Sequence, residues 1–202
     1  AYVRFMPRFT SEGELGNLIP LETVNRGMKR TYAMPSGPTA YVPVIHGCDK
    51  FCTYCIVPLR RGREESRDVD DILDEVRFLA EHGVREITLL GQTVEAYGHD
   101  LPDLPDGSRP DLATLFEGID AIEGIRRVRF LTSYPKDMTD RIVESVASQP
   151  KVCEYFNIPV QSGSNSMLER MRRGYTVEEF EERVVKIRSL MPDAAILTDV
   201  IV

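Results

Sequence analysis

Apolar residues recur in two regular patterns from residue 40 to the end of the chain. Short continuous runs predict five strands, at residues 40–45, 85–91, 127–132, 152–160 and 194–202. Between these runs, apolar residues recur at i, i+3 and i+4, and this spacing predicts helices that begin near Asp68, Leu112, Thr139 and Thr176. Strand and helix therefore alternate along this part of the chain.

This alternation, at intervals of roughly 30–45 residues, is typical of repeated βαβ units. Such units predict an α/β domain in which helices cover a parallel sheet. Five strands are too few for a closed eight-stranded barrel, so we expect an open partial (β/α) barrel of parallel strands at residues 40–202. Glycine and proline interrupt every candidate element in residues 1–39, which we interpret as a linker or lead-in segment.

The composition of the 202 residues, 42% hydrophobic and 28% charged, is that of a globular protein. No apolar run is long enough to span a membrane, and the first residues do not have the pattern of a signal peptide. Three of the four cysteines are crowded together, which suits a reducing compartment better than a disulfide framework. We therefore expect a cytoplasmic protein that does not associate with membranes.

Cys48, Cys52 and Cys55 fall within eight residues directly after the first predicted strand, with the spacing C-x-x-x-C-x-x-C. Three such thiolates can hold three irons of a 4Fe-4S cluster. The fourth iron would then accept a small molecule, as a catalytic metal site keeps one position open. The amino and carboxylate groups of S-adenosylmethionine (SAM) suit that iron. Two alternatives stay open: a zinc site completed by His46 or Cys153, and thiols without a metal.

Small and polar residues follow the next three predicted strands, in segments 91–93, 133–136 and 161–164. Ligands bind at the carboxyl ends of strands in parallel α/β folds, so these segments and the cysteine loop are expected to converge on one active site. The alternative is that polar residues merely end the strands. Small residues allow a ligand close to the backbone, and amides and hydroxyls can bond a zwitterion and a ribose. The expected SAM-binding residues are Tyr54, Gly91, Gln92, Ser133, Gln161 and Ser162.

Four arginines follow the cysteine loop although the net charge is −7. That charge argues against a protein whose whole surface binds nucleic acid, but it permits a local basic patch. Guanidinium groups match phosphate oxygens in geometry, so we expect RNA contacts here; a solvated loop with internal ion pairs is the alternative. The candidate RNA-binding residues are Arg60, Arg61, Arg63 and Arg67, with Arg172 and Arg173 as a second group.

Several stretches together resemble the radical SAM methylthiotransferase family, from about Ala40 to the end of the chain. Tyr54, directly before the third cysteine, fits the general radical SAM signature. The stretches 89–92 and 159–164 are most similar to the MiaB-type branch, which converts isopentenyl-adenosine next to the tRNA anticodon to its 2-methylthio form. Thr93 departs from the asparagine that is common in that branch. The other matching stretches are residues 47–58, 61–67, 132–133 and 198–202.

The resemblance implies a methylthiotransferase that cleaves one SAM reductively at the 4Fe-4S cluster and takes a methyl group from a second SAM. It also implies tRNA as a partner, an electron donor such as flavodoxin or ferredoxin, and a second 4Fe-4S cluster on an N-terminal domain outside this chain. A small C-terminal RNA-binding domain and a sixth strand would follow Val202. We therefore expect a radical SAM core, C-terminally incomplete, that binds one cluster but does not complete methylthiolation alone.

Two other functions remain compatible with the sequence. The same chemistry would serve another tRNA adenosine or a ribosomal-protein aspartate. A zinc-stabilised RNA-binding module without catalysis is the alternative from a different class.

Overall fold

Five parallel strands form the framework of the structure, a computed structural model that describes Tyr32 and residues 34–202. Strands β1 (Thr39–Pro43), β4 (Glu86–Leu90) and β5 (Arg127–Phe130) pair in that order. Strand β6 (Tyr155–Asn157) pairs with β7 (Ala195–Leu197). A bridge between Val128 and Val152 joins the two groups. Most of the predicted lead-in segment lies outside the described residues.

The order of the parallel strands confirms the predicted open partial (β/α) barrel. Ile87 of β4 lies opposite Ala40 of β1 and Val128 of β5, so the register places apolar residues of adjacent strands side by side. The last two strands are shorter than the apolar runs at 152–160 and 194–202. Backbone pairing nevertheless continues beyond them, because Gln161 also bridges to Val200.

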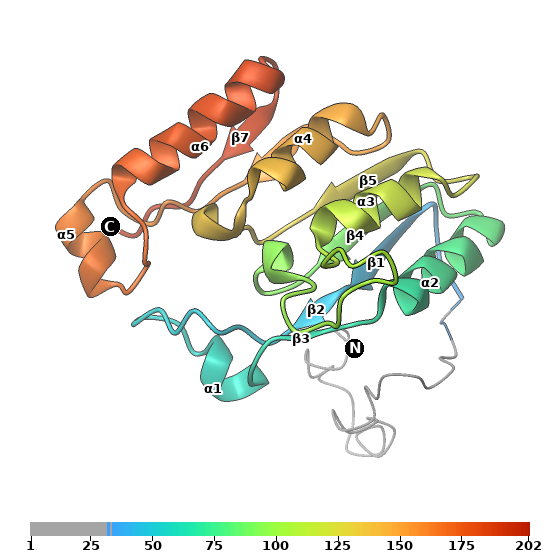
Figure 1. Ribbon diagram of the computed structural model, residues 1–202, viewed down its shortest axis with the longest axis horizontal. Helices are drawn as coiled ribbons and strands as arrows, with labels where there is room; N and C mark the ends of the chain where they lie inside the picture. The colour runs from blue at the N-terminus through green and yellow to red at the C-terminus, as the bar shows by residue number, and fades with distance from the viewer. Residues whose placement is uncertain (1–31, 33) are drawn as a thin grey trace. The chain divides into compact units, whose positions relative to one another are not determined.

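Four longer helices lie beside one another along the sheet (Figure 1), since α2 contacts α3, α3 contacts α4 and α4 contacts α6. Each starts at the predicted position, and a reciprocal capping box between Thr176 and Glu179 opens α6. The helices are α2 (Val69–Glu81), α3 (Leu112–Asp120), α4 (Asp140–Ser148) and α6 (Val177–Leu190). Among the described residues, no helix combines the length and apolar character needed to cross a bilayer.

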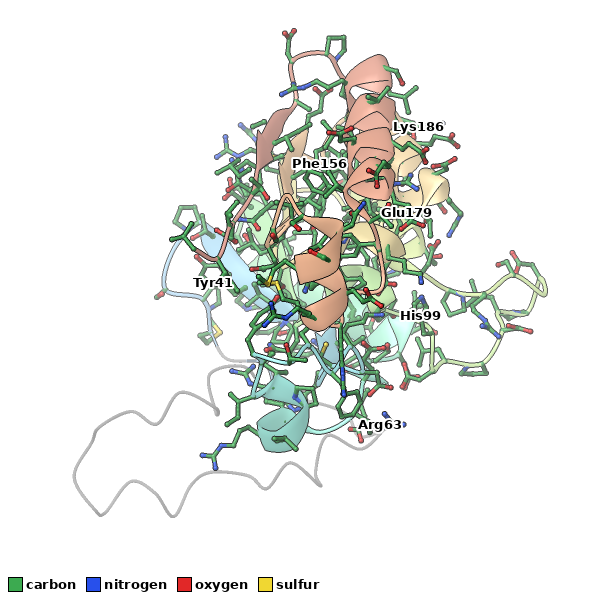
Figure 2. All side chains as sticks on the ribbon, turned by 90° about the vertical axis from the view of Figure 1, so that its left-hand side faces the viewer. Tyr41, Arg63, His99, Phe156, Glu179 and Lys186 are labelled. Carbon is green, nitrogen blue, oxygen red and sulfur yellow. The ribbon has the colours of Figure 1, made fainter. Side chains whose placement is uncertain are left out.

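Aromatic side chains hold the core together between sheet and helices. The ring of Phe130 lies 5.3 Å from that of Phe116 and 5.6 Å from that of Phe156, with all three buried. Figure 2 shows Phe156 between the strands and α6, whereas Lys186 points outward from the same helix. Burying one such ring contributes about 1.5–3 kcal/mol, so this cluster fixes the layer of helices over the strands.

Two short strands that the sequence did not predict enclose the cysteine loop. Strand β2 (Ile45–His46) pairs antiparallel with β3 (Glu65–Ser66). Helix α1 (Val57–Arg61) lies between them in sequence. Two-residue strands have no periodicity to detect, which explains why the run at 40–45 was predicted as one strand. The β2–β3 pair brings both ends of the cysteine loop together at the carboxyl end of β1.

Candidate active site

The cysteine loop is closed by backbone contacts between its two ends. The N–H of Cys48 donates to the carbonyl of Gly62 at 3.2 Å. Gly47 has a φ of +73°, and a Cβ at that position would lie 1.9 Å from the carbonyl oxygen of Arg63. Glycine is therefore required here both by the backbone conformation and by the close approach of the facing chain. This closure fixes the position of Cys48, the first of the three cysteines.

Three free thiols lie in this loop. Cys48 and Cys52 are buried and Cys55 is half-buried. The N–H of Cys55 donates to the carbonyl of Cys52 at 3.0 Å, so a tight turn separates these two cysteines. Burial raises the pKa of the Cys48 thiol, and the hydroxyl of Thr93, 3.3 Å from its sulfur, acts in the opposite direction. These contacts hold the sulfurs in a largely buried, unoxidised loop.

The donor set suits a cluster better than a single metal ion. Within the described part of the chain, no three His, Cys, Asp or Glu side chains are grouped so that they could hold one ion, as a zinc site requires. A 4Fe-4S cluster sets a different condition, because each of three thiolates holds its own iron. Three free cysteines on one short, closed loop meet that condition.

Cys153 lies away from this loop. Its N–H donates to the carbonyl of Val128 near the start of β5, and Glu86 at the start of β4 is among its charged neighbours. It therefore lies at the amino ends of the strands, opposite to the cysteine loop. His46 lies in β2, where burial lowers the pKa of its imidazole. Neither the position of Cys153 nor the grouping of potential ligands among the described residues supports the zinc alternative.

The segments after β4 and β5 meet the cysteine loop at one rim. The hydroxyl of Thr132, after β5, donates to the carbonyl of Gly91, after β4, at 2.7 Å. Lys50, from the cysteine loop, forms an ion pair with Asp137 of the 3₁₀ turn η5 (Pro135–Asp137) at 2.5 Å. The cysteine loop and the carboxyl ends of β4 and β5 are thus joined by direct side-chain contacts.

A buried carboxyl that the sequence analysis missed lies at this rim. Glu95 belongs to the 3₁₀ turn η4 (Val94–Ala96) and is 1% exposed. Its Oε2 accepts the N–H of Tyr134 at 3.2 Å, and the hydroxyl of Ser133 also interacts with the carboxyl. Burial raises the pKa of Glu95 to about 8. No periodicity marks this position, because the turn interrupts the βα pattern.

The six expected SAM-binding residues differ in how they are placed. Tyr54 is 45% exposed beside Cys55, and Gln92, Gln161 and Ser162 are half-buried. The hydroxyl of Ser133 is buried and interacts with the carboxyl of Glu95. A Cβ on Gly91 would lie 2.4 Å from Cγ2 of Ile45, so this glycine is already required by the packing of β2 on β4. The side chains of Tyr54, Gln92, Gln161 and Ser162 are therefore accessible to a ligand.

Arg173 is part of the cysteine site and not an exposed RNA contact. It is 5% exposed, and its guanidinium donates to the sulfur of Cys52 at 3.4 Å and to the hydroxyl of Tyr54 at 3.3 Å. The guanidinium of Arg173 therefore lies inside the protein and faces the cysteine loop. Two adjacent arginines look like a surface patch in a sequence, because the opposite directions of their side chains depend on the fold.

The arginines after the cysteine loop divide into two kinds. Arg67 is 6% exposed and forms ion pairs with Asp71 at 2.9 Å and Glu75 at 2.7 Å, so its charge is compensated inside the protein. Arg63 is exposed, with a single ion pair to Asp49 at 3.4 Å, and Figure 2 shows it near α1. The other candidates are Arg60 and Arg172, which are exposed, and Arg61, which is half-buried.

Parallel strands in an open α/β sheet, with a three-cysteine loop at their carboxyl ends, define a class of metal-dependent enzymes. Residues 42–202 match the Radical SAM superfamily, and the chain belongs to it. Its members take their name from SAM, and a 4Fe-4S cluster and SAM are the cofactors that membership implies. A structure of the radical SAM methyltransferase TsrM from Kitasatospora setae is similar to this chain, with a TM-score of 0.60 and 17% sequence identity. The match covers 87% of this chain and 33% of the TsrM chain. This likeness confirms the fold.

Curated relatives are much more similar in sequence. The tRNA-2-methylthio-N(6)-dimethylallyladenosine synthase of Thermotoga petrophila is 55% identical over 163 residues, 81% of this chain and 36% of the relative. The enzyme of the same name from Dictyoglomus thermophilum is 50% identical over 163 residues, with the same coverage. The chain thus spans about a third of the length of these relatives.

Proposed function

We propose that the chain is the radical SAM core of a tRNA methylthiotransferase that acts on isopentenyl-adenosine (dimethylallyl-adenosine) next to the anticodon. The observation that carries this proposal is the closed loop of three free cysteines at the carboxyl ends of the strands. The names of the relatives support the substrate. A second cluster, on a domain outside this chain, and a flavodoxin or ferredoxin as electron donor belong to the same proposal.

In this proposal, Cys48, Cys52 and Cys55 hold the three irons. The cluster, when bound, supplies the electron that cleaves SAM, a chemistry that belongs to the cofactors. The chain itself orients SAM with the phenol of Tyr54 and the neutral hydrogen-bonding groups of Gln92 and Gln161. The remaining proposed SAM contacts are Gly91, Ser133 and Ser162.

Arginines that are exposed or half-buried position RNA in this proposal. Arg60, Arg61 and Arg63 follow the third cysteine by five to eight residues, and Arg172 precedes the buried Arg173. Phosphate contacts fix the orientation of a nucleic acid without reading its sequence. These residues would therefore hold the anticodon arm while the reacting base reaches the rim.

Iron and sulfide quantitation after anaerobic reconstitution tests the proposal. We expect about four irons and four sulfides for each native chain, as for one 4Fe-4S cluster. Cys52→Ala should lose most of this iron, whereas Cys153→Ala, a matched control at the opposite end of the strands, should keep it. Stoichiometric zinc without sulfide, or equal iron in both variants, would refute the proposal and favour a binding module.

A further inference from the structure

The guanidinium of Arg173 is surrounded by neutral groups and one sulfur. Nε donates to the hydroxyl of Tyr175 at 2.9 Å, Nη2 to the carbonyl of Pro159 at 3.2 Å, and Nη1 to the hydroxyl of Tyr54 and to the sulfur of Cys52. The rings of Tyr134 and Tyr175 lie 4.6 and 5.2 Å from its central carbon. Among the described residues, no carboxylate pairs with it.

A buried cation without an anion is unfavourable, because desolvation is not compensated. Arg67 provides an internal comparison: it is equally buried, and two carboxylates pair with it. Arg173 has the same burial and no such partner in the described part of the chain. The sulfur of Cys52 is the one contact of Arg173 that becomes an anion when it binds iron.

We propose that Arg173 is a positioning residue whose guanidinium is the counter-charge of the Cys52-bound cluster and raises its reduction potential. The inference rests on the proposed function, since it requires the cluster. Reduction adds negative charge, and a hydrogen bond to a ligating sulfur stabilises that charge. The surrounding polypeptide therefore adjusts how readily the cluster accepts an electron.

The contacts around Arg173 hold it in place for this role. The hydroxyl of Tyr175 also donates to the carbonyl of Val160 at 2.9 Å, and the hydroxyl of Tyr134 donates to the carbonyl of Arg173 itself. The two phenol rings meet edge to face at 5.6 Å. A guanidinium fixed by its neighbours loses little entropy when it bonds a sulfur, so a single geometry toward Cys52 is maintained.

A potentiometric titration followed by electron paramagnetic resonance, on the reconstituted full chain without SAM, tests this inference. In Arg173→Gln we expect one-electron reduction to be about tenfold less favourable, a potential about 59 mV lower. Arg173→Lys should shift in the same direction by less, because an ammonium keeps the charge but not the fork of donors. Arg170→Gln removes the same charge from an exposed position three residues earlier and should match the native chain.

Each outcome has one meaning. A native potential in both Arg173 variants would overturn the inference. If Arg173→Gln takes up no iron, Arg173→Lys decides: a lower potential supports the inference and a native one refutes it. If the native chain takes up no iron and sulfide, the proposed function and the inference both fail. A loaded native chain with unshifted variants refutes the inference alone.

Discussion

The hydroxyl of Thr93 lies 3.3 Å from the sulfur of Cys48, and this contact joins the end of β4 directly to the cysteine loop. Thr93 is buried, so water cannot replace the bond when it is removed. The relationship links the sheet, which supplies rigidity, to the residues proposed to hold the cluster.

Thr93→Val should weaken retention of the cluster. The substitution keeps the shape of the side chain and removes one hydrogen bond to sulfur, which contributes about 1 kcal/mol. We expect a chelator to remove iron from the loaded variant about fivefold faster under anaerobic conditions. Thr93→Ser restores the hydroxyl and should release iron at nearly the native rate; equal rates for all three chains would contradict this role.

Gly47→Ala should disrupt the cysteine loop. Its added Cβ meets the carbonyl of Arg63, and the positive φ adds strain of about 1–3 kcal/mol. Gly83→Ala is the matched control, because Gly83 also has a positive φ (+93°) but open space around it. We expect both variants to be less stable in urea, and only Gly47→Ala to lose iron binding. Normal iron content in Gly47→Ala would show that the loop adapts.

Glu95 should make stability fall as pH rises. Burial raises its pKa to about 8 in the folded chain, above the value of about 4.3 for an unfolded glutamate. The folded state therefore binds more protons between these values, and the stabilisation present at acidic pH is lost as pH rises toward 8. The slope for one such group is at most about 1.4 kcal/mol per pH unit.

Urea unfolding of the native chain and of Glu95→Gln between about pH 5 and about pH 9 measures this effect, because this range covers most of the interval between the two pKa values and extends about one unit above the folded one. The difference between the two chains isolates Glu95 from other titrating groups. We expect the variant to gain stability relative to the native chain as pH rises. A difference that does not vary with pH would show that Glu95 stays ionised.

Arg67 and Arg63 should give opposite results when replaced by methionine. Arg67→Met leaves Asp71 and Glu75 without their buried partner and should cost about 3–5 kcal/mol of unfolding free energy. Arg63→Met removes one exposed ion pair and should cost less than about 1 kcal/mol.

Binding of an anticodon stem-loop at several salt concentrations completes the comparison. Arg63→Met should lower the salt dependence of the binding constant by about one counterion, because one phosphate contact is lost. An unchanged salt dependence would remove Arg63 from the proposed RNA surface.

The order of the elements could be read from the sequence because each long helix has an amphipathic face and a cap, as Thr176 and Glu179 show for α6. The parallel sheet followed from that order. Strands β2 and β3 could not be predicted, since their pairing depends on residues 21 positions apart, Ile45 and Ser66, and no periodic signal accompanies it.

The site was predictable where residue type alone determines the chemistry, as for the three cysteines. It was not predictable where the same residue type serves two roles. Arg67 and Arg63 look alike in the sequence, and only the fold shows that carboxylates of α2 enclose the first. Arg172 and Arg173 are adjacent, yet one is exposed and the other contacts Cys52. Direction of the side chain, which tertiary packing decides, separates these pairs.

Four described residues other than glycine have a positive φ, and all four belong to the rim: Phe51 (49°), Thr132 (71°), Gln161 (70°) and Arg172 (56°). Each such conformation is unfavourable by about 1–2 kcal/mol for a residue with a side chain. Directed evolution for heat tolerance would thus tend to select glycine or asparagine at these places first. Such selection would raise the thermal stability of the protein. It would also make the backbone at the active site more flexible, at a cost in activity.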